Sequence, residues 1–515
     1  MQHQLLEQIF RSFLTHQETS VVQLSLACLF KFKAKHLVPY RDLLTGILEK
    51  GRLRNALLKF QEALESEAIV SEHRKLLIPV LSRILFGRLS VRESRSGKDS
   101  LSAKRAAILS FVSLLCQEED EIFYYVYLMM RNFLPRDKVL MKEVEAYSQE
   151  ERKKILSLLD GANAQSLNLQ SSVIEGFLHL LQPVVAQLGH RIKSYIPTIT
   201  SLVVALCQVV AVTGPTENVE SDPEGMEEGP VDSLRRSAIR TLCYQRLSEM
   251  FSMYSRAVDF EIFSSRLWGA VGNAVVLLPE MVVKSEKVPA LLHMLETLSR
   301  EPSLIRILCS HEAAVSCVIK CIAGTSLPAV MHSALLIVEN LLEEAISNSD
   351  SEATDILGSN IHLLMSQFTL RLKSGGGDLD TLPQHGHQLR KAKIKLRQAT
   401  WRKELHILCR ISEFIHQHER FRGKTTENDG VLDDLSELLL PFLEPGHGTT
   451  DEDKLNVLGI LKGILGNLET KTIDVAYSTL SDILGPIKGK PGIEAISVRK
   501  EIATVIEMIG GRNKE

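Results

Sequence analysis

A short apolar stripe beside a proline recurs along the chain, and it constrains the fold more than any other feature of the sequence. The stretches are HLVPYRDLL at 36–44, LLIPVLSRIL at 76–85, YIPTITSLVV at 195–204 and KVPALLHMLE at 287–296. Counted from Pro79, Pro197 and Pro289, apolar residues fall at positions −1, +2, +5 and +6. This spacing predicts the buried face of an α-helix. Proline fits the first helical turn, because its missing N–H would have no partner there.

The distances between these prolines predict a repeat. Pro39 and Pro79 are 40 residues apart, Pro289 and Pro328 are 39 apart, and Pro79 and Pro197 are 118 apart, close to three such steps. A period of about 40 residues with two helices in each unit is typical of HEAT repeats. The sequence therefore predicts an all-α fold, an α-solenoid of HEAT-like repeats with an armadillo-type superhelix.

Helical periodicity continues along the chain, whereas strand-like alternation is almost absent. The expected helices are paired as 3–15 with 19–34, 37–49 with 52–68, 72–87 with 101–116, 120–134 with 150–160 and 167–187 with 192–212. Further helices are expected at 232–255, 260–283, 288–308, 311–323, 327–346, 352–373, 388–418, 431–443, 451–468, 471–485 and 493–509.

Polar segments divide this series into five parts. Residues 214–231 include six acidic and no basic side chains, which predicts a disordered acidic insertion. Residues 374–387 are rich in glycine and read as a flexible linker, and 91–100 form a basic loop. The expected parts are HEAT-like repeats at 1–213, the insertion at 214–231, repeats at 232–373, the linker at 374–387, and a basic helix with terminal repeats at 388–515.

Charge and cysteine content favour an intracellular protein with a possible polyanion contact. The net charge is −3, but residues 31–105 hold 17 Lys and Arg against 8 Asp and Glu, so the remainder carries about −12. A solvated basic face is the simpler explanation of that excess.

The eight cysteines are scattered through apolar runs, as reduced buried thiols are. We expect no signal peptide and no membrane span.

The sequence contains no complete catalytic motif. Gly423, Lys424 and Thr425 resemble the end of a phosphate-binding loop. That motif needs a glycine five residues before Gly423, where this chain has His418, and it needs a preceding strand, where a helix is expected here. A cluster at 309–321 contains three cysteines and His311, without a zinc-type spacing. We therefore expect no catalytic residue, metal or cofactor, no small-molecule substrate, and a protein that is not an enzyme.

Two basic segments are the candidate contacts for RNA phosphates. The first comprises Lys31, Lys33, Lys35, Arg41, Arg52 and Arg54. The second comprises Arg390, Lys391, Lys393, Lys395 and Arg397, followed by Arg402 and Lys403, with Trp401 among them. Positive charge suits a phosphate backbone, and the indole ring could stack on an unpaired base. The second segment could equally be a nuclear-import signal, or a solvated helix with its tryptophan in the core.

Longer stretches resemble a known family. CLFKFKAKHLVPYRDLLTGILEKGRLRNALLKF at 28–60 and EHRKLLIPVLSRILFGRL at 72–89 are similar to the opening of the DRIM (down-regulated in metastasis) domain. The similarity continues in AKRAAILSFVSLL at 103–115, EEDEIFYYVYLMMRNFL at 118–134, QPVVAQLGHRIKSYIPTITSLVVAL at 182–206 and LRRSAIRTLCYQRLSEMFSMYSRAVDF at 234–260. That domain belongs to the family of component 20 of the small-subunit processome, a U-three small nucleolar RNA-associated protein.

The resemblance implies a long HEAT-repeat scaffold in the nucleolus or nucleus. Its implied partners are processome proteins and pre-ribosomal RNA or small nucleolar RNA, and its implied role is processing of small-subunit ribosomal RNA. Members of the family are several times longer than this chain, and the sequence leaves open whether residues 1–515 are a fragment of a longer chain. A karyopherin-like transport adaptor, or another HEAT-repeat interaction scaffold, remains the alternative.

Overall fold

Every element of the described part of the chain is a helix, as the sequence predicts. The computed structural model describes residues 2–49, 51–90, 101–115, 119–134, 149–160, 170–212, 230–325, 327–348, 351–373, 387–418, 430–443, 449–484 and 496–512. Their contacts divide the chain into two compact units, residues 1–271 and 272–515. The expected insertion at 214–231 and linker at 374–387 fall almost wholly outside the described residues. The five-part division stays a prediction.

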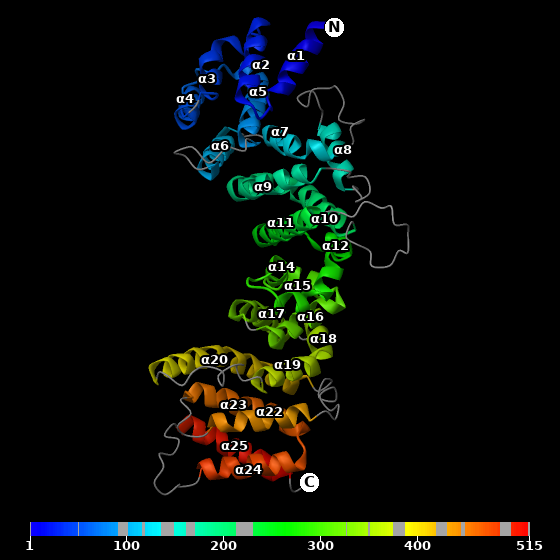
Figure 1. Cartoon of the computed structure of the whole chain (residues 1–515), viewed down its shortest axis with the longest axis vertical. Coiled ribbons are helices and arrows are strands. Elements are labelled where there is room, and N and C mark those ends of the chain that lie inside the picture. The colour runs from blue at the N-terminus through cyan, green and yellow to red at the C-terminus, as the bar shows by residue number, and fades with distance from the viewer. Residues whose placement is uncertain are drawn as a thin grey trace. The chain divides into compact units, whose positions relative to one another are not determined.

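The first unit contains α1 to α11 and most of α12 (Figure 1). The α-helices are α1 (Gln2–Phe13), α2 (Thr19–Lys31), α3 (Arg41–Gly46), α4 (Leu53–Glu65), α5 (Ser71–Ser90), α6 (Leu101–Leu115), α7 (Glu119–Met130), α8 (Gln149–Asp160), α9 (Ser171–Leu188), α10 (Ile196–Val212), α11 (Pro230–Tyr254) and α12 (Ser264–Val276). Short 3-10 helices are η1 (Val38–Tyr40), η2 (Arg131–Phe133), η5 (Gly189–Tyr195) and η6 (Glu261–Phe263).

Two rows of helices build this unit. One row runs through α4, α6, α9 and α11, each packed on the next. In the other, α5 packs on α7, α7 on η5, and η5 and α8 on α10. The predicted neighbours α1 and α2, α3 and α4, and α5 and α6 are also in contact. This two-row stack is the packing expected of an α-solenoid.

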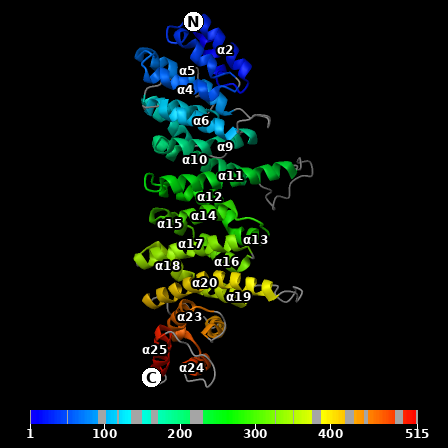
Figure 2. The same ribbon diagram turned by 90° about the vertical axis from the view of Figure 1, so that its left-hand side faces the viewer.

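The second unit repeats the two-row arrangement. Its α-helices are α13 (Leu278–Val283), α14 (Ala290–Leu298), α15 (Pro302–Cys309), α16 (Glu312–Gly324), α17 (Pro328–Ser347), α18 (Glu352–Ser359), α19 (Ile361–Lys373), α20 (His387–Gln417), α22 (Val431–Leu439), α23 (Asp451–Ile464), α24 (Thr470–Leu484) and α25 (Ile496–Arg512), with η8 (Leu440–Leu443) and η9 (Leu465–Asn467). One row joins α14, α17, α20, α23 and α25, which can be followed in Figure 2. The other joins α13, α16, α19, α22 and α24.

The apolar stripes form the core of these rows. In α10 the stripe residues Ile196, Ile199, Leu202 and Val203 are fully buried. In α14, Leu291, Met294 and Leu295 are buried, whereas Val288 precedes the helix and is half-buried. Aliphatic burial of this kind stabilises the fold by about 25 cal/mol per Å² of apolar surface removed from water.

The prolines begin helices at most of the repeat positions. Pro39 lies in η1 just ahead of α3, Pro289 caps α14, and Pro328 is the first residue of α17. Pro79 differs, because α5 continues through it. A proline inside a helix removes one backbone hydrogen bond, and here the buried stripe on both sides of Pro79 outweighs that loss.

Several expected single helices are divided in the structure. The helix expected at 288–308 is α14 and α15, because the chain turns at Ser299 before Pro302 starts the next helix. The helix expected at 352–373 is α18 and α19, separated at Asn360. Periodicity alone could not show these breaks, since the apolar pattern continues across each turn.

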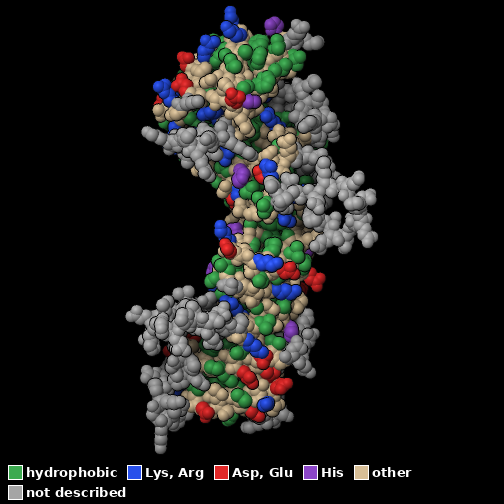
Figure 3. Space-filling view, in the orientation of Figure 1, with side chains coloured by type: hydrophobic (Ala, Val, Ile, Leu, Met, Phe, Trp, Pro, Cys, Tyr) green, Lys and Arg blue, Asp and Glu red, His purple; other side chains and the backbone are tan. Residues whose placement is uncertain are grey.

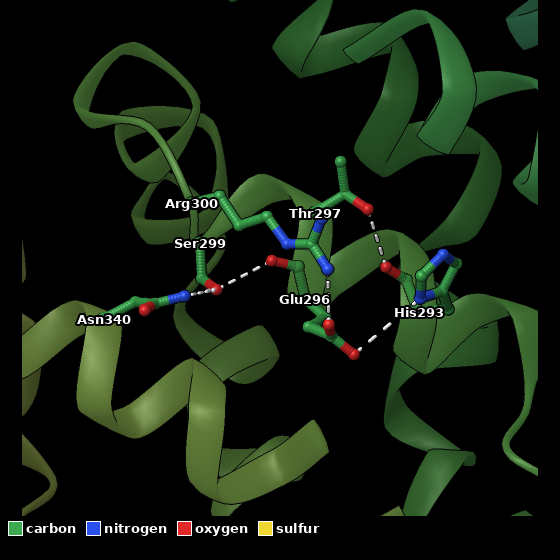
Figure 4. A network of polar contacts seen from close by, with 6 residues as sticks. All are labelled: His293, Glu296, Thr297, Ser299, Arg300 and Asn340. Carbon is green, nitrogen blue, oxygen red and sulfur yellow. Dashed lines mark hydrogen bonds and ion pairs between the residues drawn. The ribbon is translucent and has the colours of Figure 1, made fainter. Parts of the chain in front are cut away.

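A polar network holds the end of α14 against α17 (Figure 4). Asn340 of α17 donates a hydrogen bond of 2.9 Å to the Ser299 hydroxyl, which in turn donates to the Glu296 carbonyl. The Glu296 carboxylate accepts 2.7 Å from Arg300, and His293 Nδ1 lies 3.7 Å away. The network caps the chain turn that divides α14 from α15, so polar groups near the core have partners.

Among the described residues, one stretch is long and apolar enough to cross a membrane by length and composition alone. It is Ser171–Ala211, which includes α9, η5 and all but the last residue of α10, and 72% of its most apolar part is buried within the protein. Core helices of a two-row stack have the same composition, because both of their neighbours are apolar.

Candidate nucleic-acid interface

The first predicted basic segment forms a surface on α2, α3, α4 and their turns. We define the amino-terminal basic surface as Lys31, Lys33, Lys35, Arg41, Arg52 and Arg54. All six side chains are exposed. Figure 3 shows basic side chains gathered along this edge, with acidic ones interspersed. The segment is therefore available to a polyanion.

Backbone geometry at the end of α2 projects two of these lysines. Lys33 has a φ of 53°, in the left-handed region that usually ends a helix with glycine. Its N–H donates to the Phe30 carbonyl at 3.1 Å, so the last turn of α2 is closed. A lysine here costs about 1 kcal/mol of backbone strain relative to glycine. The chain changes direction at this strained turn, and the side chains of Lys33 and Lys35 are both exposed.

The two arginines beside the helices have partners within the protein. The Arg41 guanidinium lies over the Phe30 ring at 4.7 Å from its centroid, which orients it while leaving it exposed. Arg52 pairs with Glu49 at 3.1 Å, with 74% and 51% of the two side chains exposed. Such an exposed pair contributes little to stability, so a phosphate could replace Glu49.

The surface has two clusters, at opposite ends of α3. Lys31, Lys33 and Lys35 lie at the turn before η1, and Arg52 and Arg54 lie at the turn after α3. The α-helix between them, α3, has six residues and rises about 9 Å. Within the described residues the three lysines and Arg54 have no ion-pair partner.

The second basic segment is helical, and α20 matches the helix expected at 388–418. Its residues Arg390, Lys391, Lys393, Lys395, Arg397 and Trp401 lie on α20. Their side chains lie outside the described residues, so their exposure and the place of the tryptophan ring stay predictions. The next two basic residues are engaged elsewhere. Arg402 pairs with Asp453 of α23 at 3.4 Å, and Lys403 pairs with Glu339 of α17 at 3.3 Å.

The cysteine cluster weighed as a metal site has the geometry of a core. Cys317 and Cys321 are buried, and the Cys321 thiol donates to the Cys317 carbonyl at 3.2 Å. Burial raises the pKa of Cys309 to about 12 and that of Cys321 to about 12, which keeps both thiols protonated. Among the described residues, no group of three or more His, Cys, Asp or Glu side chains could hold a metal ion.

A cavity in the first unit was not indicated by any sequence pattern. It has a volume of about 780 Å³ and is lined by residues of α5, α6, η2 and α9, among them Arg105, Arg131 and Gly176. These residues are isolated in the sequence and come together only through helix packing. A local motif could not have identified them.

Two comparisons with known proteins agree with this architecture. A family model described as "U3 small nucleolar RNA-associated protein 20, N-terminal" matches residues 1–515. U3 small nucleolar RNA-associated protein 20 of Schizosaccharomyces pombe (strain 972 / ATCC 24843) is 24% identical over 198 residues, which are 38% of this chain and 7% of that protein. The aligned segment is thus a small part of the relative. The DRIM label is not part of either description and stays a prediction. Because the family model covers the whole chain, the protein belongs to the family of U3 small nucleolar RNA-associated protein 20.

Proposed function

We propose that this chain is part of a small-subunit processome component and acts in ribosome biogenesis as a non-catalytic helical scaffold. The observation that carries the proposal is the family match over residues 1–515. The proposed site of action is the nucleolus, and the proposed partners are processome proteins with pre-ribosomal or small nucleolar RNA. The family match favours this role over a karyopherin-like adaptor, which would share the same architecture.

The amino-terminal basic surface is the proposed RNA contact within the described residues. Exposed lysines at a helix turn neutralise phosphates without reading base sequence, and each neutralised phosphate adds to the salt dependence of binding. Positive charge at Lys31, Lys33 and Lys35 is not balanced by ion pairs in the described part of the chain. An assembly scaffold needs this kind of contact, since it holds RNA without acting on it.

Fluorescence anisotropy with labelled U3 small nucleolar RNA tests the contact. The triple variant Lys31→Glu, Lys33→Glu and Lys35→Glu should bind more weakly, and its log–log salt slope should be shallower by about 2, since each single-strand phosphate contributes roughly 0.7. The control variant reverses three other charges, by changing Lys284, Lys287 and Lys320 to Glu. These lysines are also exposed and lie in the second unit. Equal weakening by both variants would indicate a general charge effect and would remove this surface from the proposal.

The variant Lys33→Gly separates the effect of the lysine charge on RNA binding from any effect on the stability of the fold. Glycine adopts a φ of 53° without strain, so the variant should melt at the same or a higher temperature while losing one positive charge. Weaker RNA binding by a more stable variant would assign the effect to the lysine side chain. Co-sedimentation of the tagged chain with pre-ribosomal particles tests the broader assignment, and its absence from them would oppose the processome role.

A further inference from the structure

The cavity of the first unit combines charge with an apolar floor. Its lining includes Thr15 from the turn after α1, Arg105 of α6, Arg131 of η2, and Gly176 of α9. At about 780 Å³, the cavity is within the size range of pockets that bind ligands.

Two arginines on the wall have no carboxylate partner among the described residues. Arg131 donates from Nη2 to the Thr15 hydroxyl at 3.0 Å, and Arg105 donates from Nε to the Leu89 carbonyl at 3.1 Å. Both side chains are half-buried, and burial lowers the pKa of each guanidinium, which nevertheless stays charged at neutral pH. Charges held partly out of water without a counter-ion favour an anionic ligand.

The acidic residue on the wall does not neutralise these arginines. Glu175 of α9 forms a two-point ion pair with Arg235 of α11, at 2.8 Å and 3.1 Å. Each of its oxygens therefore already accepts a hydrogen bond from a positive charge outside the cavity lining. Burial, and to a smaller extent the nearby Arg83 charge, lowers the pKa of the Arg131 guanidinium.

The floor of the cavity favours an aliphatic or aromatic side chain over a nucleobase. Leu89, Met129 and Leu180 are buried there, and they also line a small adjoining apolar space. Phe133 and Phe177 pack on one another with ring centroids 4.8 Å apart, and both are buried. Neither ring offers a free face on which a base could stack.

We propose that this cavity binds an acidic peptide segment of a partner protein, with an apolar side chain on the floor and neighbouring Asp or Glu carboxylates on Arg105 and Arg131. The guanidinium fork suits a carboxylate in a two-point contact. The recessed position of the two arginines suits a side chain that reaches inward, whereas a continuous phosphate backbone needs a row of exposed cations. This inference is independent of the processome role, because it rests on the cavity alone.

Gly176 supplies a variant that fills the cavity without disturbing the fold. A Cβ built at Gly176 has no neighbouring atom within 4 Å, and the residue is in the interior of α9. Gly176→Leu should therefore block the cavity, and leucine favours the helical conformation more than glycine does. The matched control is Gly510→Leu in α25, where a Cβ also meets no atom within 4 Å.

The probe is a phage library of random 12-residue peptides, selected on the whole chain. We expect enriched sequences to place Asp or Glu beside a large apolar residue. A synthetic peptide of that sequence should bind at least tenfold more weakly to Gly176→Leu and to Arg105→Gln than to the wild type or to Gly510→Leu. Circular dichroism should show unchanged helicity in all three variants.

Other outcomes would overturn the proposal. One is enrichment of peptides without acidic residues. Another is selection of the same peptides on the Gly176→Leu protein as on the wild type. A third is equal affinity of the synthetic peptide for Gly176→Leu and for the wild type. Displacement of the peptide by a 12-nucleotide RNA, with RNA binding lost in Gly176→Leu, would assign the cavity to nucleic acid instead. If deletion of residues 214–229 made the peptide bind much more tightly, the chain's own acidic segment would be competing for the cavity. The cavity would then be assigned to that segment and not to a partner protein.

Discussion

Ser412 of α20 lies directly against Gly463 of α23, so that a Cβ at position 463 would be 2.5 Å from the Ser412 Cβ. One turn earlier, a Cβ at Gly459 would be 2.6 Å from the Cys409 sulfur. The two glycines allow α20 and α23 to approach closely, within the row of the second unit that joins α14, α17, α20, α23 and α25.

Gly463→Ala should destabilise the second unit by about 1–3 kcal/mol, because the added methyl group must displace backbone atoms of Ser412. Scanning calorimetry and urea unfolding measure the loss. Gly510→Ala is the control, since its Cβ meets open space and should stabilise α25 by up to about 1 kcal/mol. Equal effects at the two positions would mean that the close approach is not present in solution.

Leu44→Asp should unfold the first repeats of the chain. Leu44 is fully buried, whereas its neighbour Leu43 in the same stripe is only half-buried. An unpaired carboxylate at position 44 should cost roughly 4 kcal/mol, and neighbouring repeats should open with it because each is stabilised by the next. Hydrogen exchange should show lost protection from α2 to α5. Leu58→Asp, at a position 56% exposed, should leave protection unchanged.

Glu296 should make the second unit less stable in acid. Burial by itself would raise the pKa of this carboxyl, but hydrogen bonds from Arg300 and Ser333 and the Arg300 charge outweigh it, so the pKa lies below its ordinary 4.5. The ionised form therefore stabilises the folded state above the unfolded-state pKa, and this contribution is lost as the pH falls through the lower folded-state value.

Melting temperatures measured across that acidic range should separate Glu296→Gln from the wild type. The variant should be less stable at neutral pH, and the difference should shrink as the wild-type carboxyl is protonated. Glu286→Gln, at an exposed position just before α14, should follow the wild type at every pH. A constant difference between Glu296→Gln and the wild type would rule out the charged network as its cause.

Glu404 should have the opposite pH dependence. It is buried on α20, and burial raises the pKa of its carboxyl above the ordinary 4.5 even though Arg371 lies 3.7 Å away. Ionisation is therefore less favourable in the folded state, and stability is lost as the pH rises from the unfolded-state pKa through the folded-state one.

Glu404→Gln should consequently melt at the same temperature or higher at pH 7, and the advantage should vanish in acid. Its amide oxygen can still accept a hydrogen bond from Arg371, so that guanidinium keeps a partner. Glu437→Gln on α22, where the side chain is exposed, serves as the control. A drop of several degrees at pH 7 for Glu404→Gln alone would contradict the expected sign.

Local sequence predicts the helices well because each one carries its own signal. The 3.6-residue stripe at Ile196, Ile199, Leu202 and Val203 is buried in α10, as its spacing requires. The exposure of Lys31 and Lys33 could also be predicted, since lysine at a helix end is rarely buried. The breaks at Ser299 and Asn360 were missed because the apolar period continues across both turns, although Pro302 and Gly358 are signals of a helix end.

An all-helical chain, its aliphatic stripes and a basic segment near residue 31 could be predicted from local sequence, because these features depend on residues at most one or two turns apart. Three features could be found only in the folded stack: the helices that form each row, the close approach of Gly463 to Ser412, and the hydrogen bond from Arg131 to Thr15 across 116 residues of chain beside a cavity. The physical reason is that apolar stripes are interchangeable as packing surfaces. Only the whole stack selects the neighbour of each helix and the polar groups left between them.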